Sequence, residues 1–166
     1  MLTGSFASNI YGEGRATQDI DLVISATPNQ LSILHGLLPA SDYYFDLKSA
    51  IEAARQKSMF NVLDMASGWK IDFIFVKPDP YHQEAFSRRT FAAVDGVPLI
   101  TVTVEDLIIA KLDWARMGES SRQIRDVAGV LKIQQNSIER RYIEKWVEEL
   151  GLSAQWSEAQ KLAGLE

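Results

Sequence analysis

The chain has 166 residues, 46% hydrophobic and 23% charged, so we expect one globular domain, or one domain with a helical appendage. The absence of cysteine excludes disulfides and thiolate metal sites, and a net charge of −5 argues against a general nucleic-acid coat protein. No apolar run approaches the roughly 20 residues of a membrane helix, and the N-terminus lacks a signal-peptide pattern, so we expect a cytoplasmic protein with no membrane partner.

The first two thirds of the sequence predict strands interspersed with helices. Residues 19–24 alternate polar and apolar side chains before turning fully apolar, which is typical of a strand. Further along the chain, the predicted elements are a helix at 28–38, a helix at 46–57, the two strands of a β-hairpin at 60–65 and 69–76, a short helix at 81–88, and short strands at 91–94 and 97–102 around Asp95-Gly96.

The last third is predicted to be helical. Thr103 is placed to cap a helix that runs to about residue 117 and ends at Gly118. A second helix is predicted at 121–133, a third after Ser137 that stops at Gly151, and a short fourth after residue 153. The fold class expected from this order is α/β (α+β), a mixed sheet followed by a helical region.

Two carboxylates lie at the start of the first clear strand. Because side chains on a strand repeat with a period of two, Asp19 and Asp21 point to the same face. Two anions so close repel each other unless a cation lies between them, and Mg²⁺ is commonly bound by one or two carboxylates together with substrate phosphates. The alternative is a solvent-facing strand end that carries two exposed aspartates.

A third carboxylate, Asp72, interrupts the apolar strand of the hairpin, although aspartate is a poor strand former. If this strand lies beside the first, Asp72 joins Asp19 and Asp21 in the arrangement that a two-metal site requires. The alternative is a structural role in which Asp72 pairs with Lys70 or with another cation across the strands.

Gly4-Ser5 precedes a helix that is predicted from Phe6. A glycine before a helix N-terminus lets backbone N–H groups approach a phosphate, and the helix dipole favours the anion. The dipeptide by itself is a weak signal, and it gains meaning only from the residues that follow.

Gly4-Ser5, then Arg15-x-Thr17-x-Asp19-x-Asp21, then Asp72 on a later strand resembles the signature of DNA-polymerase-beta-type nucleotidyltransferases. More narrowly, the pattern is similar to the bacterial branch that includes AbiEii-like toxin nucleotidyltransferases. The resemblance implies a catalytic core of nucleotidyltransferase fold in residues 1–102 and a helical bundle in 103–166 packed on it. Relatives have a helix and most of a strand before Gly-Ser, so here either the sequence starts late or the first strand is only residues 1–3.

The branch also tends to carry a lysine and an aspartate on successive C-terminal helices, here Lys111 and Asp126. Lys111 falls within an apolar stripe, where it either reaches solvent or points at an anion such as a triphosphate. Asp126 either belongs to the nucleotide site or pairs with Arg122 one turn earlier. Arg15 either braces its loop or contacts phosphate.

Other aromatic and basic residues are expected to have structural roles and not to belong to a site. Trp114, Trp146 and Trp156 are expected in the core rather than as platforms for stacking a base. The arginines that would make an acceptor-RNA patch are expected to form a solvated face; they are Arg88, Arg89, Arg122, Arg125, Arg140 and Arg141.

The expected function is metal-dependent transfer of a nucleoside monophosphate from a nucleoside triphosphate such as ATP. The resemblance implies Mg²⁺ or Mn²⁺ at Asp19, Asp21 and Asp72, and nucleotide contacts at Gly4, Ser5, Arg15, Thr17, Lys111 and Asp126. The acceptor is a tRNA, a protein or a small molecule, and the resemblance implies a toxin–antitoxin role with an antitoxin protein as partner. The alternative function is a catalytically silent nucleotide- or partner-binding module with the same fold.

Overall fold

The computed structural model describes residues 1–12, 14, 16–94 and 96–165. Within them, seven strands form one mixed sheet in the order β3-β4-β5-β2-β1-β7-β6. The strands are β1 (Leu2–Thr3), β2 (Asp19–Ile24), β3 (Tyr43–Phe45), β4 (Met59–Asp64), β5 (Lys70–Phe75), β6 (Thr90–Val94) and β7 (Val97–Thr101). The helices are α1 (Gly4–Tyr11), α2 (Pro28–Leu37), α3 (Leu47–Gln56), α4 (Pro80–Ser87), α5 (Val104–Gly118), α6 (Ser121–Gln134), α7 (Arg140–Glu149) and α8 (Ser153–Ala163).

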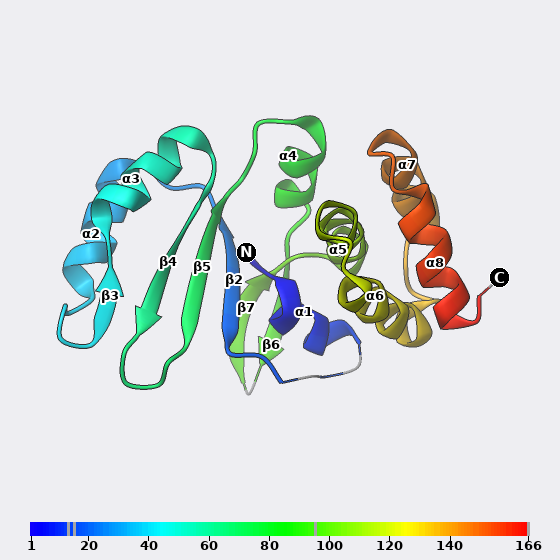
Figure 1. Cartoon of the computed structure of the whole chain (residues 1–166), viewed down its shortest axis with the longest axis horizontal. Helices are drawn as coiled ribbons and strands as arrows, with labels where there is room; N and C mark the ends of the chain where they lie inside the picture. The colour runs from blue at the N-terminus through cyan, green and yellow to red at the C-terminus, as the bar shows by residue number, and fades with distance from the viewer. Residues whose placement is uncertain (13, 15, 95, 166) are drawn as a thin grey trace.

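The helices gather at two sides of the sheet (Figure 1). Helices α2 and α3 lie beside β3 and β4 and close a small core that includes Leu31, Phe60 and Phe75. Helices α5 to α8 form a larger group on the other side, whose core includes Leu107 and Ile143. The predicted fold class, a mixed sheet flanked by helices with a helical C-terminal third, is confirmed. The division into units at residue 102 stays a prediction.

Local capping chemistry explains why the predicted helices begin where they do. The Thr27 hydroxyl accepts from the backbone N–H of Gln30, whose side chain accepts from the backbone N–H of Thr27, a reciprocal capping box. The carboxylate of Asp46 and the hydroxyl of Thr103 likewise accept from the first turns of α3 and α5. Helix α5 includes Gly118 instead of ending before it, and Glu119 takes the left-handed C-terminal position.

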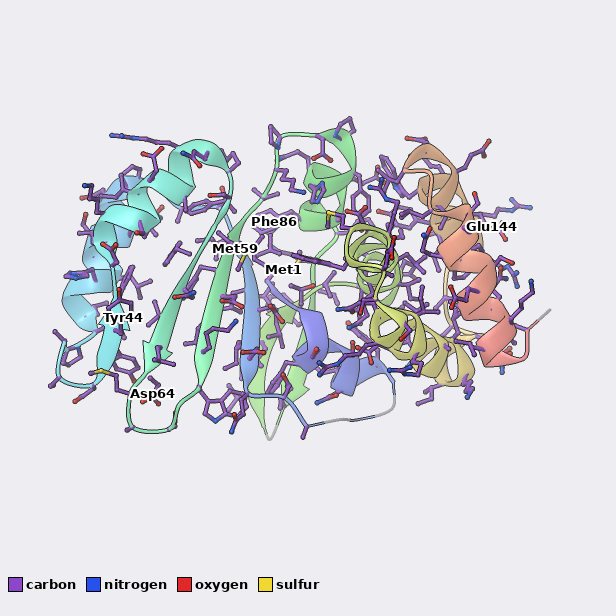
Figure 2. All side chains as sticks on the ribbon, viewed as in Figure 1. Met1, Tyr44, Met59, Asp64, Phe86 and Glu144 are labelled. Carbon is purple, nitrogen blue, oxygen red and sulfur yellow. The ribbon has the colours of Figure 1, made fainter. Side chains whose placement is uncertain are left out.

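Strand β1 is only two residues long but lies in the middle of the sheet. It pairs antiparallel with β2 and parallel with β7, and Met1 accordingly lies near the centre of the molecule in Figure 2. Helix α1 follows directly and begins at Gly4, two residues before its predicted start. The chain turns from strand to helix without a loop, so the backbone at Gly4 is held against the sheet.

The predicted hairpin is confirmed, since β4 and β5 pair antiparallel. The other neighbour of β5 is β2, and this pair is parallel with Asp21 opposite Asp72. None of the described helices has the length and apolar composition needed to cross a bilayer.

Candidate active site

Three aspartates come together because of the pairing between β2 and β5. Asp19 pairs with Lys70 and Asp21 pairs with Asp72. Paired residues of neighbouring strands point to the same face of a sheet, and residues two apart on one strand share that face. The condition stated from the sequence, that the two strands lie side by side, is therefore met.

The ammonium group of Lys70 lies between two of these carboxylates. Its Nζ is 2.7 Å from Asp72 Oδ2 and 3.5 Å from Asp19 Oδ1. The pairing of Asp72 with Lys70, one of the two alternatives drawn from the sequence, is thus present in the structure. It does not satisfy Asp72, however, because the residue is 6% exposed and its Oδ1 has no hydrogen-bond partner among the described residues.

A buried carboxylate oxygen without a partner is costly, so Asp72 Oδ1 is a candidate ligand for a cation or acceptor for a proton. The neighbouring Asp21 shows the same excess of negative charge. Burial raises the pKa of the Asp21 carboxyl above its ordinary value, and the charges of Asp72 and Asp19 raise it further. Lys70 and Lys111 lower this pKa without cancelling the rise.

Gly4 allows the backbone at the start of α1 to approach Asp21. Its φ is +65°, and a Cβ built there would lie 2.6 Å from the Asp21 carboxyl carbon, so a side chain does not fit without moving the aspartate. The Thr3 side chain does not cap α1. Because Gly4 approaches Asp21, the N-terminus of α1 lies beside the carboxylates. A helix N-terminus is suited to an anion such as phosphate.

These residues line one open cleft with a volume of about 260 Å³. Of the predicted site, Gly4, Ser5, Thr17, Asp19, Asp21 and Lys111 line it, and further lining residues are Thr3, Ile74, Leu107, Ala110, Trp114, Arg122 and Gln123. Asp72 does not line the cleft but is joined to it through Lys70 and by its pairing with Asp21. The cleft is therefore built from the central strands, α1, α5 and α6.

Lys111 and Asp126 meet at the wall of this cleft. Lys111 Nζ lies 2.8 Å from Asp126 Oδ2 and 3.1 Å from Gln123 Oε1. Lys111 is 3% exposed, so the interpretation that its side chain reaches solvent is wrong. Asp126 pairs with this lysine, where the sequence had offered Arg122 as its partner. The ion pair connects α5 to α6 and places a cation behind the carboxylates.

Thr17 acts on the same site through the backbone. Its Oγ1 accepts from the backbone N–H of Asp19 at 3.2 Å, which orders the chain as it enters β2. Arg15, the remaining predicted nucleotide contact, lies outside the described residues. Thr17 therefore positions Asp19 and also lines the cleft.

The expectation for Trp114 is wrong. Trp146 and Trp156 are buried as expected, but Trp114 is 52% exposed and lines the cleft. It follows Lys111 by three positions on α5, and that spacing would have placed it on the same helical face.

Arg88 also departs from the expected solvated face. Its guanidinium lies 3.2 Å from Asp106 Oδ2 and stacks over Tyr142, so it joins α4 to α5 and α7.

The donor set fits a hard divalent cation. Asp21 and the Oδ1 of Asp72, which has no hydrogen-bond partner in the described part of the chain, are oxygen ligands of the kind Mg²⁺ or Mn²⁺ prefers, with Asp19 on the rim. Within the described part of the chain, no three His, Cys, Asp or Glu side chains already stand at spacing suited to a shared ion. The Lys70 ammonium lies between two of the three carboxylates. Any ion would therefore share the site with water and phosphate oxygens.

No protein-family model and no curated protein sequence matches the chain. Among solved structures, the fold is similar to that of an antigenic nucleotidyltransferase-like protein from Paracoccidioides brasiliensis, with a TM-score of 0.50. The comparison covers 95% of this chain and 83% of that chain at 16% sequence identity, so the likeness concerns the fold alone. The chain thus has a nucleotidyltransferase-like fold, which bears out the fold class predicted from its sequence.

Proposed function

We propose that the chain is a metal-dependent nucleotidyltransferase that moves a nucleoside monophosphate from a nucleoside triphosphate to an acceptor hydroxyl. The observation that carries the proposal is the carboxylate pair across β2 and β5, in which Asp21 lies opposite Asp72 and Asp72 keeps a buried oxygen without a partner among the described residues. Asp21 lines a cleft at the N-terminus of α1 with Lys111 in its wall, and Asp72 lies behind Asp21 on the neighbouring strand.

The residues of the cleft can be assigned to the reaction. Backbone N–H groups at Gly4 and Ser5, with the Ser5 hydroxyl, bind the β- and γ-phosphates at the start of α1. Asp21, Asp72 and Asp19 would hold Mg²⁺ or Mn²⁺, which when bound neutralises triphosphate charge and lowers the pKa of the acceptor hydroxyl.

The Asp72 carboxylate would also take the acceptor proton. The acceptor oxygen then bonds to the α-phosphorus, and the bond from that phosphorus to the bridging oxygen of pyrophosphate breaks. Lys111 lines the same cleft, where its ammonium would offset part of the charge on the leaving phosphates. The exposed ring of Trp114 supplies a surface on which a base can stack.

The finer identity of the enzyme rests on the sequence pattern. The resemblance to AbiEii-like toxin nucleotidyltransferases supports a toxin role with an antitoxin protein as partner, and with a tRNA, a protein or a small molecule as acceptor. It also supports a catalytic core in residues 1–102 with the C-terminal helices packed on it.

The test is release of pyrophosphate, with each of the four nucleoside triphosphates, with Mg²⁺ or Mn²⁺, and with tRNA, protein and small hydroxyl acceptors. We expect turnover that is lost in Asp21→Asn and Asp72→Asn. Asp42→Asn, which alters an exposed aspartate outside the cleft, is the matched control and should keep full activity. Turnover that survives Asp72→Asn would contradict the proposed role of the carboxylates.

One observation favours the alternative of a catalytically silent nucleotide- or partner-binding module. Lys70 already pairs with Asp72, as a structural salt bridge would. A silent module would bind a nucleoside triphosphate, seen as a rise in melting temperature, and release no pyrophosphate with any acceptor class. The proposal of catalysis would then fail while the fold assignment stands.

A further inference from the structure

Lys70 is placed unlike an ordinary surface lysine. It is the first residue of β5, on the face that carries the carboxylates, and its Nζ contacts Asp72 Oδ2 at 2.7 Å and Asp19 Oδ1 at 3.5 Å. Its side chain is 40% exposed, whereas that of Asp72 is 8% exposed. The ammonium therefore closes the site from the solvent side, with the carboxylate behind it.

A single ammonium does not neutralise this site. Three carboxylates share the face, and the next cation, Lys111, is already paired with Asp126. The ammonium of Lys70 contacts Asp72 and Asp19 only, so the three carboxylates still outnumber the cation that pairs with them. A divalent cation bound to Asp72 beside the ammonium would be repelled by it at short range, and that repulsion is strong in a partly buried site.

We propose that Lys70 is a built-in counter-ion that occupies the cation position between Asp19 and Asp72 and gives it up when a divalent cation binds. The proposal rests on the proposed function, because it concerns the same carboxylates. Lys70 holds the buried carboxylate in the absence of metal and swings outward on its flexible stem when metal arrives. The incoming triphosphate provides a new partner for the ammonium, so metal and nucleotide bind together more tightly than either binds alone.

Removing the charge should separate two effects of Lys70. Lys70→Met keeps a long apolar stem but leaves the Asp72 carboxylate without its ammonium, so the variant should melt at a lower temperature in the presence of a chelator. The same variant loses the competing cation, so it should bind Mn²⁺ at least about tenfold more tightly than the wild type. A merely structural salt bridge would lower the melting temperature and leave the Mn²⁺ affinity unchanged or reduced.

The experiment is a Mn²⁺ titration followed by electron paramagnetic resonance of the free ion, with melting temperatures recorded with and without Mn²⁺. The proteins compared are the wild type, Lys70→Met, Lys70→Arg and Asp72→Asn. Lys48→Met, which removes an exposed lysine on α3, is the matched control. We expect tighter binding in Lys70→Met, weak binding in Lys70→Arg, none in Asp72→Asn and no change in Lys48→Met.

The outcomes separate this proposal from the proposed function. Asp72-dependent Mn²⁺ binding in the wild type that is equal or weaker in Lys70→Met overturns the counter-ion role and leaves the metal site standing. An absence of Asp72-dependent binding in both proteins overturns both proposals. If Lys70→Met does not fold, Lys70→Gln, which donates a hydrogen bond without a charge, decides by the same comparison. A Lys70→Met protein that folds only with Mn²⁺ present supports the proposal.

Discussion

Gly4→Ala tests whether the close approach of α1 to the carboxylates matters for the site. The alanine Cβ would lie 2.6 Å from the carboxyl carbon of Asp21 and closer still to its Oδ2, whereas ordinary contact begins near 3.4 Å, so the aspartate must move by more than about 0.8 Å. The backbone adds a second cost, because Gly4 has a φ of +65°. An L-residue in that left-handed conformation is destabilised by roughly 1–2 kcal/mol.

The two effects are measurable separately. Urea denaturation should show the loss of roughly 1–2 kcal/mol in the free energy of unfolding. Mutation of a residue that supports a metal ligand typically costs about 10–100-fold in metal affinity or activity. Gly4 supports the position of Asp21, so Mn²⁺ affinity and turnover should both fall by a factor in this range. The assays are the Mn²⁺ titration and pyrophosphate release.

Gly36→Ala is the matched control. Gly36 lies in α2, and a Cβ there meets nothing within 4 Å, so this variant should be neutral or slightly stabilising and should bind Mn²⁺ like the wild type. The reasoning is refuted if Gly4→Ala has the unfolding free energy and the Mn²⁺ affinity of the unaltered protein. Such a result would mean that Asp21 does not need its present position.

Lys111→Met should lower the free energy of unfolding by about 3–5 kcal/mol because it leaves the Asp126 carboxylate buried without its ammonium. Urea denaturation measures this loss of stability. The double variant Lys111→Met/Asp126→Leu should recover most of the lost free energy. Burial and a hydrogen bond to a buried carboxylate raise the pKa of Tyr142, so the folded protein keeps this hydroxyl protonated after the unfolded chain begins to ionise near pH 10. The stability from Tyr142 is complete below pH 10 and is lost above it at about 1.4 kcal/mol per pH unit. Burial also raises the pKa of Tyr81, so Tyr142→Phe should reduce the alkaline slope by this amount without abolishing it. Trp114→Ala should weaken binding of the Mn²⁺–ATP complex by about 1–3 kcal/mol if a base stacks on the ring, measured by titration calorimetry, while Ile133→Ala, which also alters an exposed helical side chain, should not.

The helix starts were predictable because their causes are local. Thr27, Asp46 and Thr103 each accept a hydrogen bond from the helix that follows them, within three residues along the chain. Strand β3 escaped prediction because Tyr43–Phe45 is too short for an alternating pattern to stand out. Its extended form depends on pairing with β4, which the local sequence does not contain.

The site divides in the same way. The shared face of Asp19 and Asp21 follows from the period of a strand. Their proximity to Asp72 depends on the parallel register of β2 and β5, which joins residues about fifty positions apart and is not written in either segment. The sequence presented metal binding and a Lys70 pair as alternatives for Asp72; the structure pairs Oδ2 with Lys70 and leaves Oδ1 without a hydrogen-bond partner among the described residues.

The expectation that Trp114 lies in the core rested on its residue type alone, and it is wrong. Aromatic residues on helices are usually core residues, and Trp146 and Trp156 obey that expectation. Trp114 lies where α5 passes the mouth of the cleft, so its ring is left open to solvent. Only the packing of α5 against α1 and α6 reveals that location.

The central claim, that carboxylates of β2 and β5 hold one divalent cation together, is tested most directly by anomalous diffraction from crystals grown with Mn²⁺ and a non-hydrolysable ATP analogue. We predict an anomalous peak that contacts the carboxylates of both Asp21 and Asp72, with the Lys70 ammonium turned away from Asp72. A well-ordered nucleotide whose manganese peak lies elsewhere, with Asp72 still paired to Lys70, would contradict the account.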